Sequence, residues 1–222
     1  MIKKVIWASM IDYPGKISAV IFVGKCNFNC SYCYNRTIIN EKDIDFDKYI
    51  LPKLLERKEF VPYVIISGGE PTADEEFEDI LEKLYKNEFV IGVHTNGSNP
   101  EIIKKHIDKI DFLGIDMKSS KGKYDYIAGV KVNFDKVKET IKIAIDNKKS
   151  LEIRTTLFPK YVDTDDCVEI AGMLKELGVK EYQLQQFYAV NGAEDVESYS
   201  NDKLMKIQEE CNKILPTILK TK

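Results

Sequence analysis

The hydrophobic and polar positions of the chain alternate between two kinds of pattern. Six short apolar runs are typical of buried strands: Ser18–Val23, Tyr63–Ser67, Phe89–Thr95, Phe112–Met117, Leu151–Leu157 and Glu181–Phe187. Between them lie amphipathic segments that predict helices: Asp45–Lys58, Asp74–Lys86, Pro100–His106, Asn133–Asn147, Thr164–Leu177 and Asn201–Ile214. Six strand and helix units in succession predict an α/β fold, a partial (β/α)6 barrel with parallel strands and outer helices.

Composition and charge narrow the class of protein. The 222 residues are 44% hydrophobic and contain no repeat or long linker, so we expect one domain over residues 1–222. The net charge is only −3, which predicts neither a nucleic-acid partner nor a membrane surface. No apolar segment is long enough for a signal peptide or membrane span, and cysteines in a cluster loop favour a reducing compartment, so we expect the cytoplasm.

Three cysteines directly follow the first predicted strand. Cys26, Cys30 and Cys33 have the spacing C-x3-C-x2-C, which allows three thiolates to bind one soft-metal cluster. A four-iron cluster needs four ligands, so one iron would be left open to a group that is not protein. Structural zinc is the alternative, but it needs a fourth nearby ligand. The remaining cysteines, Cys167 and Cys211, stand apart in sequence, which predicts a single cluster.

Polar or glycine-rich residues also follow the other predicted strands, at the end where barrel-like α/β folds bind ligands. The second strand ends in Gly68-Gly69-Glu70, which could approach a ligand closely or simply form a tight turn. Asp116 and Lys118 end the fourth strand, where Asp116 could instead cap the next segment. Arg154, one of three arginines, lies on the fifth strand, and a charged group there needs a partner or a polar lumen.

The cysteine motif with Tyr32 before its last cysteine, followed by Gly68-Gly69-Glu70, resembles the radical S-adenosylmethionine (SAM) superfamily. The resemblance spans nearly the whole chain and implies a radical SAM core domain over residues 1–222. Four further motifs look like the activating enzymes of glycyl radical enzymes: Asp12-Tyr13-Pro14-Gly15, Cys33-Tyr34-Asn35-Arg36, Thr95-Asn96-Gly97 and Asp116-Met117-Lys118. The compact length and the ending Leu184-Gln185-Gln186-Phe187 look most like the activating protein of anaerobic ribonucleoside-triphosphate reductase.

The resemblance implies a role for each candidate site residue. Cys26, Cys30 and Cys33 would hold one 4Fe-4S cluster, whose open iron takes the amino and carboxylate groups of SAM. The other candidates would bind SAM itself: Tyr32 near the adenine, Gly68, Gly69 and Glu70 at the methionine ammonium, and Asp116 and Lys118 at the ribose hydroxyls and the carboxylate. Arg154 is a candidate for the same carboxylate from its charge and strand position.

The implied activity is an oxidoreductase that cleaves SAM to a 5′-deoxyadenosyl radical and takes a hydrogen from a glycine of a partner enzyme. The implied partners are a glycyl radical enzyme, with anaerobic ribonucleotide reductase favoured, and an electron donor such as flavodoxin or ferredoxin. Relatives carry an acidic residue where this chain has His94, beside a monovalent cation site, so binding of that cation is left open. The alternatives are a radical SAM enzyme acting on a small molecule, as in deazapurine biosynthesis, and a non-enzymatic metal scaffold.

Overall fold

Eight strands form one curved sheet in chain order. The computed structural model describes residues 1–189 and 196–221. The strands are β1 (Ile2–Tyr13), β2 (Lys16–Val23), β3 (Tyr63–Gly68), β4 (Val90–Thr95), β5 (Phe112–Asp116), β6 (Ser150–Leu157), β7 (Tyr182–Gln186) and β8 (Thr217–Lys220). Strands β2 to β8 are parallel, and β1 pairs antiparallel with β2. Since β1 and β8 do not pair with each other within the described residues, the barrel is open on one side.

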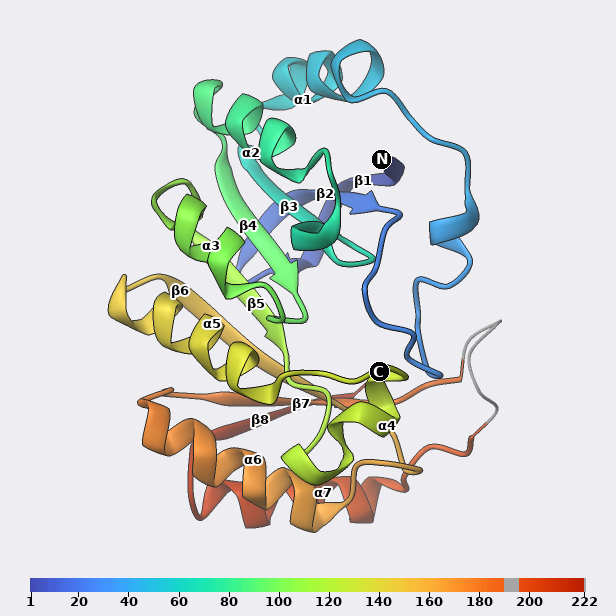
Figure 1. The fold of residues 1–222 in the computed structure, drawn as a ribbon, viewed down its shortest axis with the longest axis vertical. Helices are drawn as coiled ribbons and strands as arrows, with labels where there is room; N and C mark the ends of the chain where they lie inside the picture. The colour runs from blue at the N-terminus through green and yellow to red at the C-terminus, as the bar shows by residue number, and fades with distance from the viewer. Residues whose placement is uncertain (190–195, 222) are drawn as a thin grey trace.

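Helices cover the outer side of this sheet (Figure 1). They are α1 (Leu51–Arg57), α2 (Phe77–Lys86), α3 (Pro100–His106), α4 (Tyr124–Ala128), α5 (Phe134–Asp146), α6 (Thr164–Leu177) and α7 (Asn201–Asn212). All six predicted strands and five of the six predicted helices are confirmed, and α3 and α6 begin and end at the predicted residues. The expected helix Asp45–Lys58 is instead a π-helical turn at Phe46–Ile50 followed by α1, where Pro52 lacks the N–H that a continuous α-helix needs.

Strands β1 and β8 and helix α4 were not predicted, so the sheet has seven parallel strands rather than six. The six strand and helix units from β2 to α7 stand as expected, and the added strands lie at the two edges. Strand β1 is irregular in register and largely half-buried or exposed, and its longest apolar run covers only residues 5–8. Strand β8 has only four residues. Edge strands bury less of each side chain, which weakens the pattern that identifies central strands.

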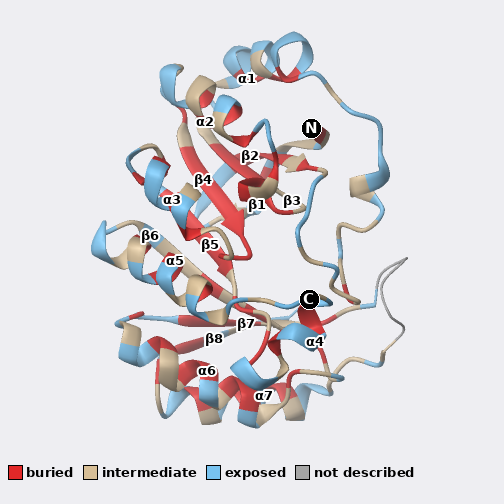
Figure 2. Cartoon of the chain, in the orientation of Figure 1, coloured by how far each residue is buried: buried red, intermediate tan, exposed pale blue. Residues whose placement is uncertain are grey.

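The core lies mainly between the sheet and the helices, where the strands are buried along most of their length (Figure 2). A smaller apolar cluster of Val20, Ile65 and Phe112 lies on the other face of the sheet, inside the barrel. Tyr13 packs against Phe112 there, with ring centroids 5.0 Å apart. Phe112 is the first residue of β5, so this cluster fills the barrel near the amino ends of the strands and leaves room at their carboxyl ends. Along the described chain, no helix is long and apolar enough to cross a membrane.

Candidate active site

One cavity of about 500 Å³ lies at the carboxyl ends of the strands. It brings together nine of the ten candidate site residues from four parts of the chain: Cys26, Cys30, Cys33, Tyr32, Gly68, Gly69, Asp116, Lys118 and Arg154. The tenth, Glu70, does not line it. Cys167 and Cys211 lie elsewhere; both are buried, and a hydrogen bond between the two thiols, together with burial, raises the pKa of Cys167. Two distant cysteines are thus neighbours in the core, away from the cavity.

The cysteines lie on the segment of residues 24–36, here called the cluster loop. Within it the Phe28 N–H donates to Cys26 Sγ at 3.4 Å, and Arg36 Nη2 donates to the Cys30 carbonyl at 2.6 Å. Burial raises the pKa of the Cys26 thiol to about 11 and also raises the pKa of Cys30. These thiols therefore need a positive metal centre before they become thiolates at neutral pH.

The arrangement of the three thiols suits a cluster better than a single ion. No group of three or more His, Cys, Asp or Glu side chains in residues 1–189 and 196–221 could hold one metal ion, so the structure gives no support to the structural zinc alternative. The three thiols instead share the wall of one cavity. Three soft donors on one wall are the ligands that an iron-sulfur cluster uses, and thiolates that each bind a different iron lie further apart than thiolates that bind one ion.

Gly68 and Gly69 let the loop after β3 lie directly against the cluster loop. The Glu70 N–H donates to the Lys25 carbonyl at 2.7 Å, and a Cβ on Gly69 would lie 2.1 Å from that carbonyl oxygen. Gly68 has φ +112°, and a Cβ there would lie 2.4 Å from the Val23 nitrogen. Only glycine fits either position. The two glycines therefore line the cavity and also allow the close backbone contact that supports the cluster loop.

The cluster loop also reaches the other half of the barrel. The ring of Tyr32 stacks on Phe158, which follows β6, with centroids 5.2 Å apart. The Asn29 N–H donates to the carbonyl of Ala128 at the end of α4, at 2.8 Å. Tyr32 is only 3% exposed, and its hydroxyl has no hydrogen-bond partner among the described residues. A buried hydroxyl on the cavity wall without a protein partner is an available donor or acceptor for a bound ligand.

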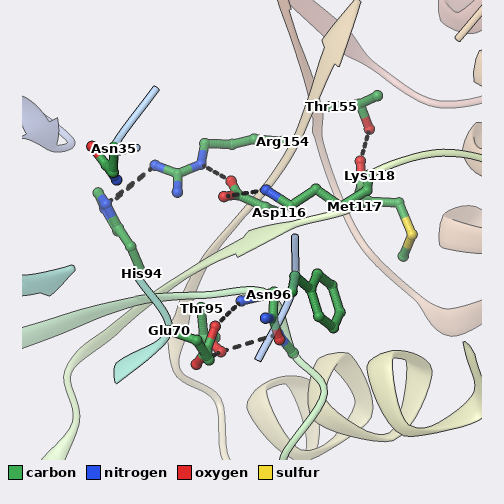
Figure 3. A network of polar contacts seen from close by, with 12 residues as sticks. Asn35, Glu70, His94, Thr95, Asn96, Asp116, Met117, Lys118, Arg154 and Thr155 are labelled. Atoms are coloured by element: carbon green, nitrogen blue, oxygen red, sulfur yellow. Dashed lines mark hydrogen bonds and ion pairs between the residues drawn. The ribbon is translucent and has the colours of Figure 1, made fainter. Parts of the chain in front are cut away.

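A row of polar side chains crosses β4, β5 and β6 on the cavity wall (Figure 3). Asp116 accepts from Lys118 Nζ at 3.0 Å and from Arg154 Nε at 2.9 Å. Burial alone would raise the pKa of Asp116, but the charges of Arg154 and Lys118 outweigh it and hold the pKa well below its usual range. Burial opposes the charge of Lys118, yet the neighbouring carboxylate raises its pKa well above the ordinary value. The row therefore presents two fixed cations to the cavity around one carboxylate.

His94 ends this row and is neutral. Its Nε2 lies 3.0 Å from the Asp12 carbonyl, which can only accept, so Nε2 carries the proton and donates, and Arg154 Nη1 lies 3.4 Å from both ring nitrogens. Burial and the charge of Arg154 lower the pKa of His94 to about 3. This position thus carries no charge, and the neighbouring positive charge comes from Arg154.

The carboxylate of Glu70 is fully buried and turns away from the cavity. It accepts from the Thr72 N–H at 3.1 Å, the Thr72 hydroxyl at 2.6 Å, the Thr95 hydroxyl at 2.7 Å and the Asn96 N–H at 2.6 Å. The expected contact between this side chain and the methionine ammonium stays a prediction. In the structure the carboxylate instead joins the loop after β3 to the end of β4 (Figure 3).

Sequence reasoning assigned no role to several side chains that organise the site. Asn35 Nδ2 donates to the Gly68 carbonyl at 2.6 Å, and Asn96 Nδ2 donates to Asn27 Oδ1 at 2.9 Å. Arg36 lines the cavity, and its hydrogen bond to the Cys30 carbonyl joins two parts of the cluster loop. The signal for Asn35, Arg36 and Asn96 was their place in the resemblance motifs. Asn27 had no such signal.

Comparison with known proteins assigns the family. The model of the radical SAM superfamily matches residues 20–184, which contain all ten candidate site residues. The chain belongs to the radical SAM superfamily. Its members are oxidoreductase-type enzymes that use a 4Fe-4S cluster and SAM, and these are the cofactors of this radical SAM enzyme. The cavity fits them, since it unites three thiols, two cations and an unpartnered buried hydroxyl.

Two relatives from Methanocaldococcus jannaschii carry names that place them among the glycyl-radical enzyme activating enzymes. One is 32% identical over 205 residues, which are 84% of this chain and 80% of the relative. The other is 28% identical over 217 residues, which are 95% of this chain and 82% of the relative. A solved domain of pyruvate-formate lyase-activating enzyme from Bacteroides vulgatus has a TM-score of 0.59 at 17% identity, and the match covers 71% of this chain and 98% of that domain. It is similar in fold.

Proposed function

We propose that this radical SAM enzyme is an activase that abstracts a hydrogen atom from a glycine of a partner enzyme, and that the partner is anaerobic ribonucleoside-triphosphate reductase. The observation that carries the proposal is the single cavity, which joins the three thiols to Asp116, Lys118 and Arg154 in a barrel with unpaired edge strands β1 and β8. An open side gives a protein loop room to approach. The two relatives with activating-enzyme names support the same assignment.

The residues of the cavity divide the work of binding. Cys26, Cys30 and Cys33 would hold the cluster, and Lys118 and Arg154 would bind the methionine carboxylate of SAM. Both cations are largely buried, with side-chain exposures of 16% and 11%, so a carboxylate that reaches them is little screened by water. Tyr32 would pack beside the adenine. When bound, the cluster supplies the electron that cleaves SAM to methionine and a 5′-deoxyadenosyl radical, which takes a hydrogen from the glycine.

The remaining parts of the proposal concern the setting of the enzyme. We place it in the cytoplasm, because three free thiols that must carry a cluster need a reducing compartment. A flavodoxin or ferredoxin would supply the electron. We assign residues 1–222 to one radical SAM core domain, in keeping with one sheet that holds every described strand.

The test is an activation assay with the reconstituted, reduced protein, SAM and an anaerobic ribonucleotide reductase. We expect a glycyl radical on the reductase, seen as a doublet by electron paramagnetic resonance, with 5′-deoxyadenosine formed in step. Lys118→Ala should keep its iron but bind SAM more weakly by about tenfold or more, since a charge-assisted contact is worth roughly 1.5–3 kcal/mol. Formation of 5′-deoxyadenosine only with a small metabolite, and no radical on any glycyl radical enzyme, would overturn the proposal.

A further inference from the structure

Three side chains close a ring of hydrogen bonds between the cluster loop and the loop after β4. Asn96 Nδ2 donates to Asn27 Oδ1 at 2.9 Å, and Asn27 Nδ2 donates to Ser98 Oγ at 2.8 Å. The Ser98 N–H completes the ring by donating to Asn96 Oδ1 at 2.9 Å. We call this ring the amide clamp. Both amides use their oxygen and their nitrogen in it, so their orientation is fixed and the two loops are held in one register.

The β4 side of the clamp is firmly anchored. Asn96 is 6% exposed, and its N–H donates to the buried Glu70 carboxylate at 2.6 Å. The next residue, Gly97, donates its N–H to the Thr95 hydroxyl at 3.0 Å, and its carbonyl accepts from the Thr140 hydroxyl of α5 at 2.7 Å. The backbone around Asn96 is therefore fixed by a strand, a buried carboxylate and a helix, and the clamp transmits that rigidity to the cluster loop.

On the other side, Asn27 lies between a cluster ligand and the group that donates to that ligand. It follows Cys26 and precedes Phe28, whose N–H donates to Cys26 Sγ at 3.4 Å. The direction of the Phe28 N–H depends on the φ and ψ angles of Asn27, since these angles set the peptide plane between the two residues. Holding the Asn27 side chain thus holds this N–H toward the sulfur.

We propose that the amide clamp of Asn27, Asn96 and Ser98 sets the reduction potential of the cluster by keeping the Phe28 N–H on the Cys26 sulfur. Reduction adds negative charge to the cluster and its thiolates, and a hydrogen bond to a sulfur stabilises that charge. The three residues are positioning residues, because none of them touches the cavity thiols with its side chain. The inference rests on the cluster and does not depend on which protein is the partner.

The experiment compares midpoint potentials of the reconstituted protein and its variants, measured by redox titration followed by electron paramagnetic resonance. Asn27→Ala and Asn96→Ala each break the link between the loops, and each should lower the reduction equilibrium constant about tenfold, equal to about 59 mV for one electron. Asn99→Ala is the matched control, because Asn99 Nδ2 donates to the Thr72 hydroxyl in the same region without reaching the cluster loop. Its potential should equal that of the parent protein.

A double variant separates the clamp from general loosening of the site. If both amides act through the same link, Asn27→Ala with Asn96→Ala should shift the potential no further than either change alone. Ser98→Ala removes one bond of the ring and should give a smaller shift, so it tests the clamp if an asparagine variant fails to take up iron. Potentials equal to that of Asn99→Ala, or shifts that add in the double variant, would overturn the proposal.

Discussion

Glu70 is the residue whose role the structure changes most. As the last residue of a Gly-Gly-Glu motif it was expected at the SAM ammonium, yet in the structure its carboxylate accepts four hydrogen bonds from Thr72, Thr95 and Asn96. A buried carboxylate with four donors keeps two strand ends in register, and its removal leaves those donors without an acceptor away from water. Its contribution to the site is therefore indirect.

Replacement of Glu70 should cost stability before it affects binding. We expect Glu70→Ala to lower the free energy of unfolding of the metal-free protein by about 3 kcal/mol or more, because each buried donor left unsatisfied costs about 1–3 kcal/mol. Denaturant unfolding measures this. Glu75→Ala is the control, since that side chain is 88% exposed and its removal should change stability by no more than about 0.5 kcal/mol. Unchanged stability with weaker SAM binding would instead assign the Glu70 carboxylate to the ligand.

His94 should make the protein sensitive to mild acid. Its pKa is about 3 in the folded protein, because of burial and Arg154, against about 6.5 in an unfolded chain. Below about pH 6.5 the unfolded chain binds a proton that the folded protein excludes, so stability falls as the pH drops toward 3. His94→Gln, which can still donate to the Asp12 carbonyl, should lose about 1 kcal/mol less than the parent between about pH 6.5 and 5.5. The measurement is urea unfolding of both proteins at the two pH values. Equal losses in the free energy of unfolding for the parent and His94→Gln would contradict this account.

At the scale of elements, the close contact between the loops after β2 and β3 carries the cysteines. Gly69→Ala would place a Cβ 2.1 Å from the Lys25 carbonyl oxygen, so the cluster loop has to move. We expect this variant to retain much less iron and sulfide than the parent after reconstitution. The control is Gly172→Ala in α6, where a Cβ meets nothing within 4 Å and alanine favours the helix. Equal iron in both variants would show that the contact is not needed.

At the scale of the whole molecule, the cluster loop connects the two ends of an open barrel. It leaves β2, lies against the loop after β3, and then contacts Phe158 after β6 and Ala128 after β5. The segment that carries the three cysteines therefore also ties together strands that are far apart in the sheet. Filling the site should stabilise both halves of the molecule at once.

Hydrogen exchange of the metal-free and reconstituted proteins tests this coupling. We expect cluster loading to slow amide exchange in the cluster loop and also in the segments around Ala128 and Phe158, because their contacts with the loop become more persistent. Helix α1 lies on the outer side of the barrel and serves as the internal reference (Figure 1). Slower exchange confined to the cluster loop would show that the two ends of the barrel are independent.

The sequence by itself determined the parts of this protein that depend on short stretches of chain. Central strands need continuous apolar runs because both of their faces are buried, and Cys26, Cys30 and Cys33 line one cavity because they share one loop. Because the strands are parallel, their carboxyl ends lie at one edge of the sheet. The sequence could therefore place the candidate residues near these ends together, and nine of the ten meet in one cavity.

Only the tertiary structure decided which polar groups pair. Glu70 meets Asn96 and Asn27 meets Asn96 across 26 and 69 residues of sequence. No local pattern encodes such partners, since they depend on how the strand ends stack in the sheet. The edge strands β1 and β8 were likewise decided only by the tertiary structure. A strand that pairs on one side only does not need the long apolar run that identifies the central strands.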